Sequence, residues 1–192
     1  QADTNALNTT SVAGAITVTG NADTTSVTTV DAAVVTASST KAGHVAGAVT
    51  VNDANKASTT AAGTITDVSV TNAAAVTVNS SALTTLTLAG TVTSANLDTL
   101  GALATGALTS LTVNTSTMAM SGALQVDAQV TTLNLANTGT SSIGDLDASG
   151  ATTVNVSGTG KLTLTALTAT AATSFVSTQT AGGLVIAPAL GT

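Results

Sequence analysis

The chain has 192 residues and a formal net charge of −6, with nine acidic side chains that are all Asp and three basic side chains that are all Lys. So little basic charge argues against a nucleic-acid partner, because phosphate binding needs a basic patch, and the lack of Cys excludes disulfides. Thr, Ser or Asn interrupts every apolar run before the roughly 18 residues of a membrane helix, so we expect no membrane insertion.

Residues 1–62 carry the weaker part of the sequence pattern. A short alternating segment occurs there as GAITVT from Gly14 and as GAVTVN from Gly47, and a third copy, AAVTVN, begins at Ala74. Such alternation predicts half-buried β-strands, because successive side chains of a strand point to opposite sides. The stretch 42–63 also holds the single His, His44, and many Ala, and it predicts long loops or a short helix.

A more regular repeat follows this stretch. It consists of an apolar residue or Ala, then Thr, then Thr, Ser or Asp, and then an apolar–x–apolar triplet, which is degenerate in the last copy. The six copies begin at Ile65, Leu83, Leu108, Val130, Ala151 and Ala172. Their separations are 18, 25, 22, 21 and 21 residues, which indicates one structural unit per copy.

Stacking of these copies predicts two apolar columns. The first column contains Val68, Leu86, Leu111, Leu133, Val154 and Phe175, and the second contains Val70, Leu88, Val113, Leu135 and Val156, with Ser177 in the last position. We therefore expect an all-β fold, a right-handed parallel β-solenoid (β-helix) with roughly 20 residues per coil. An antiparallel sandwich is the alternative, but it would need hairpin turns about every 8–12 residues and would leave the aligned spacing unexplained.

We expect one β-solenoid segment over residues 1–192, less regular over 1–62 and most regular over 63–180. The chain begins at Gln1 and shows no charged segment followed by an apolar signal region. Either a leader has been removed or these residues are a piece of something longer, and we expect a fragment of a longer chain.

Several consecutive segments resemble the RTX-type surface-layer (S-layer) proteins of Gram-negative bacteria. They are VTGNADTTSVTT, VAGAVTVNDANKASTTAAGTI and VNSSALTTLTLAGT, followed by TTLNLANTG and TTVNVSG, and they extend from about Thr17 to the C-terminus. The resemblance implies a secreted, extracellular protein of the bacterial cell surface with a calcium-bound β-solenoid. It also implies assembly with copies of itself into a two-dimensional lattice.

The sequence departs from this family in two respects. The RTX nonapeptide, of the form GGxGxDxUx, does not occur, and the helical anchoring domain that binds lipopolysaccharide in the family has no counterpart here. The chain therefore resembles only the central β-solenoid part of such a protein. Contact with outer-membrane lipopolysaccharide is implied only through parts outside this sequence.

Calcium is the one cofactor that the sequence suggests. The ion takes roughly six to eight oxygen ligands, and short Asp side chains at turns can supply them. Asp145 and Asp147, in GDLDASG, would lie on the same side of a strand end, while Asp23 and Asp53 each lie near an Asn at an expected turn. We predict these four Asp as metal ligands. The alternative is that Asp and Asn at the corners cap turns with their own side chains.

Other candidate residues have structural explanations. His44 is the single His and the chain has no Glu and no GxSxG motif, so we expect no catalytic residue and no enzyme. Asn134 and Asn155 would point outward on adjacent coils, and we expect them to form a short amide ladder with a structural role in the assembly.

Two classes of function fit this sequence. The first is a structural, self-assembling cell-surface protein that forms a calcium-stabilised S-layer lattice, with an extracellular filament or adhesin stalk as a close variant. The second is an ice-binding module, because Thr-rich solenoids can present regular Thr-x-Thr ranks. Only Thr85 and Thr87 form such a pair among the six outward pairs of the main repeat, so ice binding is the minor alternative.

Overall fold

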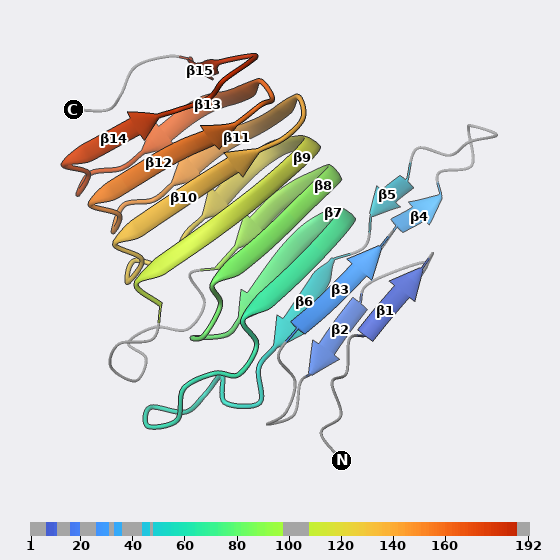
Figure 1. Cartoon of the computed structure of the whole chain (residues 1–192). Coiled ribbons are helices and arrows are strands. Elements are labelled where there is room, and N and C mark those ends of the chain that lie inside the picture. The colour runs from blue at the N-terminus through green and yellow to red at the C-terminus, as the bar shows by residue number, and fades with distance from the viewer. Residues whose placement is uncertain are drawn as a thin grey trace.

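The computed structural model shows an all-β chain (Figure 1). It describes residues 7–10, 16–19, 26–30, 33–35, 44–46, 48–97 and 108–187, and no helix occurs in these ranges. The strands are β1 (Leu7–Thr10), β2 (Ile16–Thr19), β3 (Ser26–Val30), β4 (Ala33–Val35), β5 (His44–Ala46), β6 (Val49–Asn52), β7 (Asp67–Asn79), β8 (Thr85–Asn96), β9 (Ser110–Gln125), β10 (Thr132–Asn137), β11 (Ser141–Asp147), β12 (Thr153–Gly158), β13 (Leu162–Thr168), β14 (Ser174–Ser177) and β15 (Leu184–Ile186).

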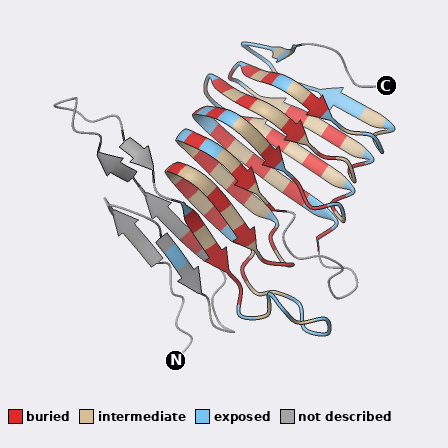
Figure 2. Ribbon diagram, turned by 180° about the vertical axis from the view of Figure 1, so that it is seen from behind, coloured by how far each residue is buried: buried red, intermediate tan, exposed pale blue. Residues whose placement is uncertain are grey.

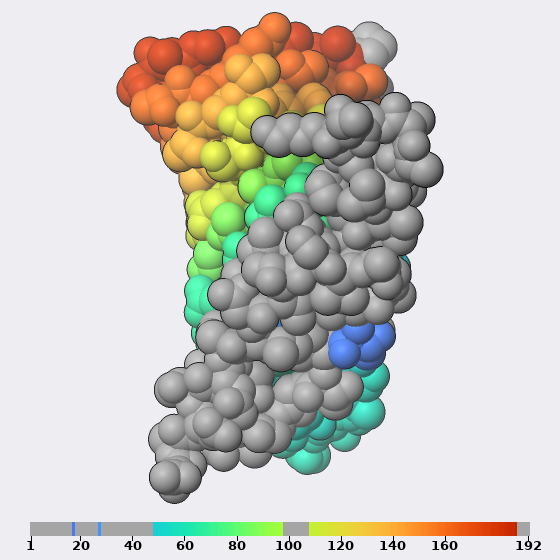
Figure 3. Space-filling model, turned by 90° about the vertical axis from the view of Figure 1, so that its right-hand side faces the viewer, coloured from blue at the N-terminus to red at the C-terminus, as the bar shows by residue number. Residues whose placement is uncertain are grey.

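The strands stack in parallel as successive coils of a β-solenoid, which confirms the predicted fold class. We call the path β1-β3-β7-β8-β9-β10-β12-β14 face A, and the path β2-β6-β7-β8-β9-β11-β13-β15 face B. The long strands β7, β8 and β9 belong to both faces, whereas later coils use one strand for each face. The coils follow one another along one axis in chain order, and the space-filling view shows the same order (Figures 1 and 3).

The three long strands turn from face A to face B at residues with positive φ. These residues are Asn72 (56°), Gly90 (70°) and Thr117 (46°). The corners of neighbouring coils lie against one another, since a Cβ atom at Gly90 would overlap the side chain of Asn72. Position 90 thus needs Gly for its left-handed backbone and for the close approach of the preceding coil.

A single apolar core fills the space between the two faces (Figure 2). It is made almost entirely of Val, Leu, Ile and Ala, and Met118 and Met120 complete it in β9. Leu86, Leu111 and Leu133, from three coils, are each 0% exposed. Branched side chains of similar size suit strands stacked about 4.8 Å apart, because each layer must fit the same narrow interior.

The register differs from the predicted columns at one step. Leu86 of β8 pairs with Val113 of β9, two residues beyond the predicted partner Leu111. Leu111 instead begins a column that continues through Leu133 and Val154. A shift of two residues keeps every side chain on its original side of the strand, so the hydrophobic alternation could not distinguish the two registers.

The coil that begins with β3 contains two insertions. β4 and β5 form an antiparallel hairpin, the one antiparallel pair among the described strands. Residues 53–66 then leave the coil between β6 and β7. Within the stretch 42–63, the described residues form β5, β6 and part of this loop, so the prediction of a long loop is met and that of a helix is not.

Candidate functional site

The Thr at the second position of the repeat joins each coil to the one before it. Its hydroxyl Oγ1 donates a hydrogen bond to the carbonyl of the equivalent Thr, and we call these residues the reach-back threonines. The pairs are Thr84 to Thr66, Thr131 to Thr109, Thr152 to Thr131 and Thr173 to Thr152, with Oγ1–O distances of 3.1, 3.1, 3.1 and 3.2 Å. The backbone N–H groups of the reach-back Thr and of the next residue donate to the same carbonyl.

The register shift interrupts this series between Thr84 and Thr109. There the carbonyl of Thr84 accepts from the backbone N–H of Thr112 at 2.8 Å. Bonding between coils therefore explains the repeated Thr along most of face A. The hydroxyl groups are used as donors to the preceding coil.

Amide side chains form a second kind of contact between coils. Asn155 Nδ2 donates to Asn134 Oδ1 at 2.9 Å, so the expected amide contact between these coils is present, while its part in assembly stays a prediction. Asn79 Nδ2 makes the same type of bond to Asn52 Oδ1 at 2.7 Å. Such side-chain ladders stabilise flat stacks of parallel strands.

A buried polar pair lies inside face A. Thr115 follows Leu88 in the column because of the register shift, and it is 3% exposed. Its Oγ1 donates to Asn137 Oδ1 at 2.9 Å, and Asn137 Nδ2 donates to the carbonyl of Gly139 at 2.6 Å. Both side chains therefore find partners within the core, as buried polar groups require.

Asp53 is buried and holds the base of the loop 53–66. Its Oδ1 accepts from the backbone N–H of Asn55 at 2.8 Å. Its Oδ2 accepts from the N–H groups of Thr64 and Ile65 at 2.6 and 2.8 Å, and from Ser80 Oγ at 2.9 Å. These four bonds fit the capping alternative, because they occupy both carboxylate oxygens with donors from the chain itself.

Asp145 and Asp147 flank buried Leu146 in β11, so both lie on the outer side of face B. The strand is irregular just before Asp145, whose neighbours in register are the small residues Ala123 and Ala166. Asp145 Oδ1 is buried and accepts no hydrogen bond from the described residues. Asp147 Oδ1 accepts from the N–H of Ser149 at 3.2 Å. The prediction that these two carboxylates share one side of a strand agrees with the structure.

The remaining predicted ligand, Asp23, lies outside the described residues. Within the described part of the chain, no three His, Cys, Asp or Glu side chains come together as a possible metal site. A cation at Asp145 and Asp147 would therefore need further oxygens from backbone carbonyls, water or a second molecule.

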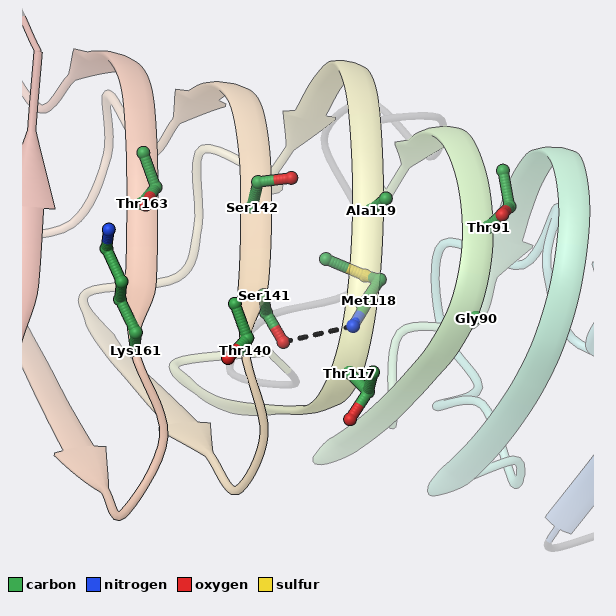
Figure 4. A pocket seen from close by; sticks show the side chains of 10 residues that line it. All are labelled: Gly90, Thr91, Thr117, Met118, Ala119, Thr140, Ser141, Ser142, Lys161 and Thr163. Carbon is green, nitrogen blue, oxygen red and sulfur yellow. Dashed lines mark hydrogen bonds between the residues drawn. The ribbon is translucent and has the colours of Figure 1, made fainter. Parts of the chain in front are cut away.

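A shallow groove of about 410 Å³ follows the corner between the faces (Figure 4). Thr91, Ala119, Ser142 and Thr163 line it at corresponding positions on successive coils. Lys161 supplies an exposed ammonium group. At its floor, the N–H of Met118 donates to Ser141 Oγ at 3.1 Å. The groove thus offers hydroxyl groups and one positive charge, and its ten lining residues include no carboxylate or imidazole.

No protein-family model matches the chain, and no curated protein matches its sequence. Among the described residues, no helix is long and apolar enough to cross a membrane. The β-solenoid fold fits a structural repeat protein.

Some contacts of the structure have a visible sequence signal, and others have none. The Thr at the second position was visible in every copy of the repeat, but its bond to the preceding coil depends on the stacking register. Thr115 and Asn137 were hidden because the column containing Thr115 arises only from the register shift. Ser80, which donates to Asp53, follows the strand β7 and gave no signal in the repeat.

Proposed function

We propose that the chain is a structural segment of an extracellular, self-assembling protein of a bacterial cell surface, of the RTX-type S-layer kind. The main support is the pair of continuous parallel faces, in which similar coils are joined by reach-back threonines and amide pairs. These hydrogen bonds between coils stiffen the stack along the solenoid axis. A protein whose repeated side chains are used to hold its own coils together is well suited to be a wall or spacer.

The outer surfaces also support this proposal. On the regular coils of face A, the outward side chains are short and half-buried, as at Thr132, Asn134 and Asn155. The described residues include only two Lys, Lys56 and Lys161. Short polar side chains lose little conformational entropy when a surface is covered, so such a face can pack against a copy at low cost.

Calcium is part of the proposal, and Asp145 and Asp147 are the residues that would hold it. The buried oxygen Asp145 Oδ1 accepts no bond from the described residues, and a buried carboxylate oxygen is costly without a partner. Carboxylate oxygens are ligands that calcium prefers. When bound, calcium would neutralise these two acids where copies meet. Asp53 has no such free capacity, since four donors of the chain already surround it.

Negative-stain electron microscopy of the purified chain, in millimolar calcium and again with a chelator, tests the proposal. We expect sheets or filaments with calcium that dissolve when the ion is removed. The double variant Asp145→Ala/Asp147→Ala should lose the calcium response. Asp67→Ala is the matched control, because Asp67 is exposed and the bond it accepts from the described residues is a local one, from Thr66 Oγ1 at 2.6 Å.

The form of the assemblies separates the variants of this function. A two-dimensional lattice would support the S-layer proposal, and single filaments would favour a filament or adhesin stalk. Isolated short rods in both conditions would contradict self-assembly of this segment. Assemblies that form equally with calcium, with the chelator and in the Asp145→Ala/Asp147→Ala variant would support self-assembly and contradict a role of calcium in it.

A further inference from the structure

The groove at the corner between the two faces crosses four successive coils in the middle of the stack. Its lining residues belong to the coils of β8, β9, β11 and β13, and coils continue on both sides, because β7 pairs with β8 and β15 pairs with β13. Thr91, Ala119, Ser142 and Thr163 form one register column along it. With strands about 4.8 Å apart, this column is about 14 Å long. The groove is therefore elongated along the solenoid axis.

A buried hydroxyl group lies at the floor of this groove. Ser141 is 2% exposed, and its Oγ accepts a hydrogen bond from the N–H of Met118 at 3.1 Å. A serine hydroxyl also has one proton to donate. Among the described residues, this proton has no acceptor. Because an unused donor in a buried place is costly, an acceptor oxygen of a ligand in the groove would be stabilising there.

Lys161 gives the groove its positive charge. Its side chain is exposed and extends along β13 toward Thr163 (Figure 4). No acidic side chain lines the groove, and Lys161 forms no ion pair with the described part of the chain. An ammonium group donates hydrogen bonds and accepts none, and its strongest partners are negatively charged oxygens. The groove therefore favours a ligand with an acidic group.

The rest of the lining indicates what else the ligand must carry. Most of its polar side chains are Thr and Ser, whose hydroxyls both donate and accept hydrogen bonds. A ligand with many hydroxyl groups of its own matches such a surface. A single ammonium pairs with one acidic group, and the net charge of −6 disfavours a polyanion. The volume of about 410 Å³ suits a small molecule, since such sites usually have about 300–1,000 Å³.

We propose that the groove binds a short saccharide with one acidic group, laid along the solenoid axis. The acidic group pairs with Lys161, one acceptor oxygen takes the proton of Ser141 Oγ, and the sugar hydroxyls bond to Thr91, Ser142 and Thr163. The small side chain of Ala119 leaves room for the ligand between Thr91 and Ser142. This binding uses no contact between copies, so it is an activity beyond the proposed self-assembly.

Two substitutions in the groove test the proposal, each with a matched control. Lys161→Gln removes the positive charge, and Lys56→Gln makes the same change in the loop 53–66, outside the groove lining. Ala119→Leu fills the middle of the groove, and Ser121→Leu adds an apolar side chain at another exposed position of β9. Circular dichroism and thermal melting establish that each variant is folded.

Isothermal titration calorimetry of the purified chain measures the binding, with a chelator present so that calcium cannot bridge the ligand to Asp145 and Asp147. The probes are aldotriouronic acid, which is a trisaccharide with one carboxylate, the neutral xylotriose, and sulfate as a simple anion. We expect aldotriouronic acid to bind more tightly than either of the other two. Lys161→Gln should weaken this binding about tenfold, as expected for the loss of one charge-assisted hydrogen bond. Ala119→Leu should weaken it at least as much, and both controls should bind like the parent chain.

Several results would overturn the proposal. Equal binding of aldotriouronic acid and xylotriose would remove the acidic group from it. Sulfate that binds as tightly as aldotriouronic acid would show a simple anion site and no saccharide site. Binding that is unchanged in Lys161→Gln and Ala119→Leu would place the ligand outside the groove, and no binding of any probe would overturn the site altogether. None of these results would affect self-assembly, which electron microscopy tests separately.

Discussion

The coils from β10 to β14 and the coils from β6 to β9 are built on the same two faces but are held together differently. From β10 onward, equivalent residues of face A are 21 residues apart, as at Leu133, Val154 and Phe175, and the reach-back bonds are continuous. Between β7 and β9 the steps are 18 and 27 residues, as at Val68, Leu86 and Val113. There, the reach-back bond from Thr84 to Thr66 is followed by the interruption at Thr109, and individually placed polar side chains supply further bonds.

This difference shows that the regular and the irregular coils are stabilised by different kinds of hydrogen bond. In the regular region, many weak and exposed bonds repeat, so each one contributes little. In the irregular region, buried Asp53 satisfies several partners. Where the two regions meet, buried Asn137 of β10 does the same. Loss of one buried group leaves several polar atoms without partners, which costs more than the loss of one exposed bond.

The largest expected effect is that of Asp53→Ala. This change removes the acceptor of three backbone N–H groups and of Ser80 Oγ at the base of the loop 53–66. Unpaired buried groups cost about 1–3 kcal/mol each, and with partial relaxation of the loop we expect a loss of about 3 kcal/mol. Urea unfolding followed by circular dichroism measures it.

Asp67→Ala is the control for this change, because it removes an exposed Asp of the neighbouring segment and should alter stability by less than about 0.5 kcal/mol. The loss at Asp53 should be the same with calcium and with a chelator. A loss that appears only in calcium would contradict the capping role and return Asp53 to the candidate ligands.

A double-mutant cycle at Thr115 and Asn137 tests the point where the two regions meet. Thr115→Val and Asn137→Leu each leave the other side chain without its partner, and we expect each to cost about 1–2 kcal/mol. The double variant should cost about 1 kcal/mol less than the sum, because it continues the apolar column of Leu88. Additive costs in thermal unfolding would show that the pair is not coupled.

Much of the regular region could be predicted from the sequence, because the 21-residue spacing and the alternation of side chains reflect the stacking directly. The position of Asp145 and Asp147 on one side of a strand followed from the same alternation. The register shift could not be predicted, since a two-residue slip preserves alternation. For Asp53, local capping was the predicted alternative, and its bond from Asn55 agrees with it. Its distant partners could not be predicted: Thr64, Ile65 and Ser80 are 11, 12 and 27 residues away, and only the path of the loop brings them together.

The smallest expected effect concerns the reach-back threonines. Thr152→Val keeps the shape of the side chain and removes its bond to the carbonyl of Thr131, so we expect a cost of about 0.5 kcal/mol. Thr109→Val is the matched control, because Thr109 has the same place in the repeat but makes no such bond to Thr84, at the register shift. We expect its cost to be close to zero.

Because a single difference of this size is hard to measure, the triple change of Thr131, Thr152 and Thr173 to Val gives the stronger test. If the bonds act independently, the triple variant should lose about 1.5 kcal/mol in urea unfolding, three times the single effect. A loss near zero would mean that the backbone N–H groups that share each carbonyl are sufficient to join the coils. The repeated Thr would then need another explanation, and the turns just before the strands of face A, where these residues lie, would be the place to seek it.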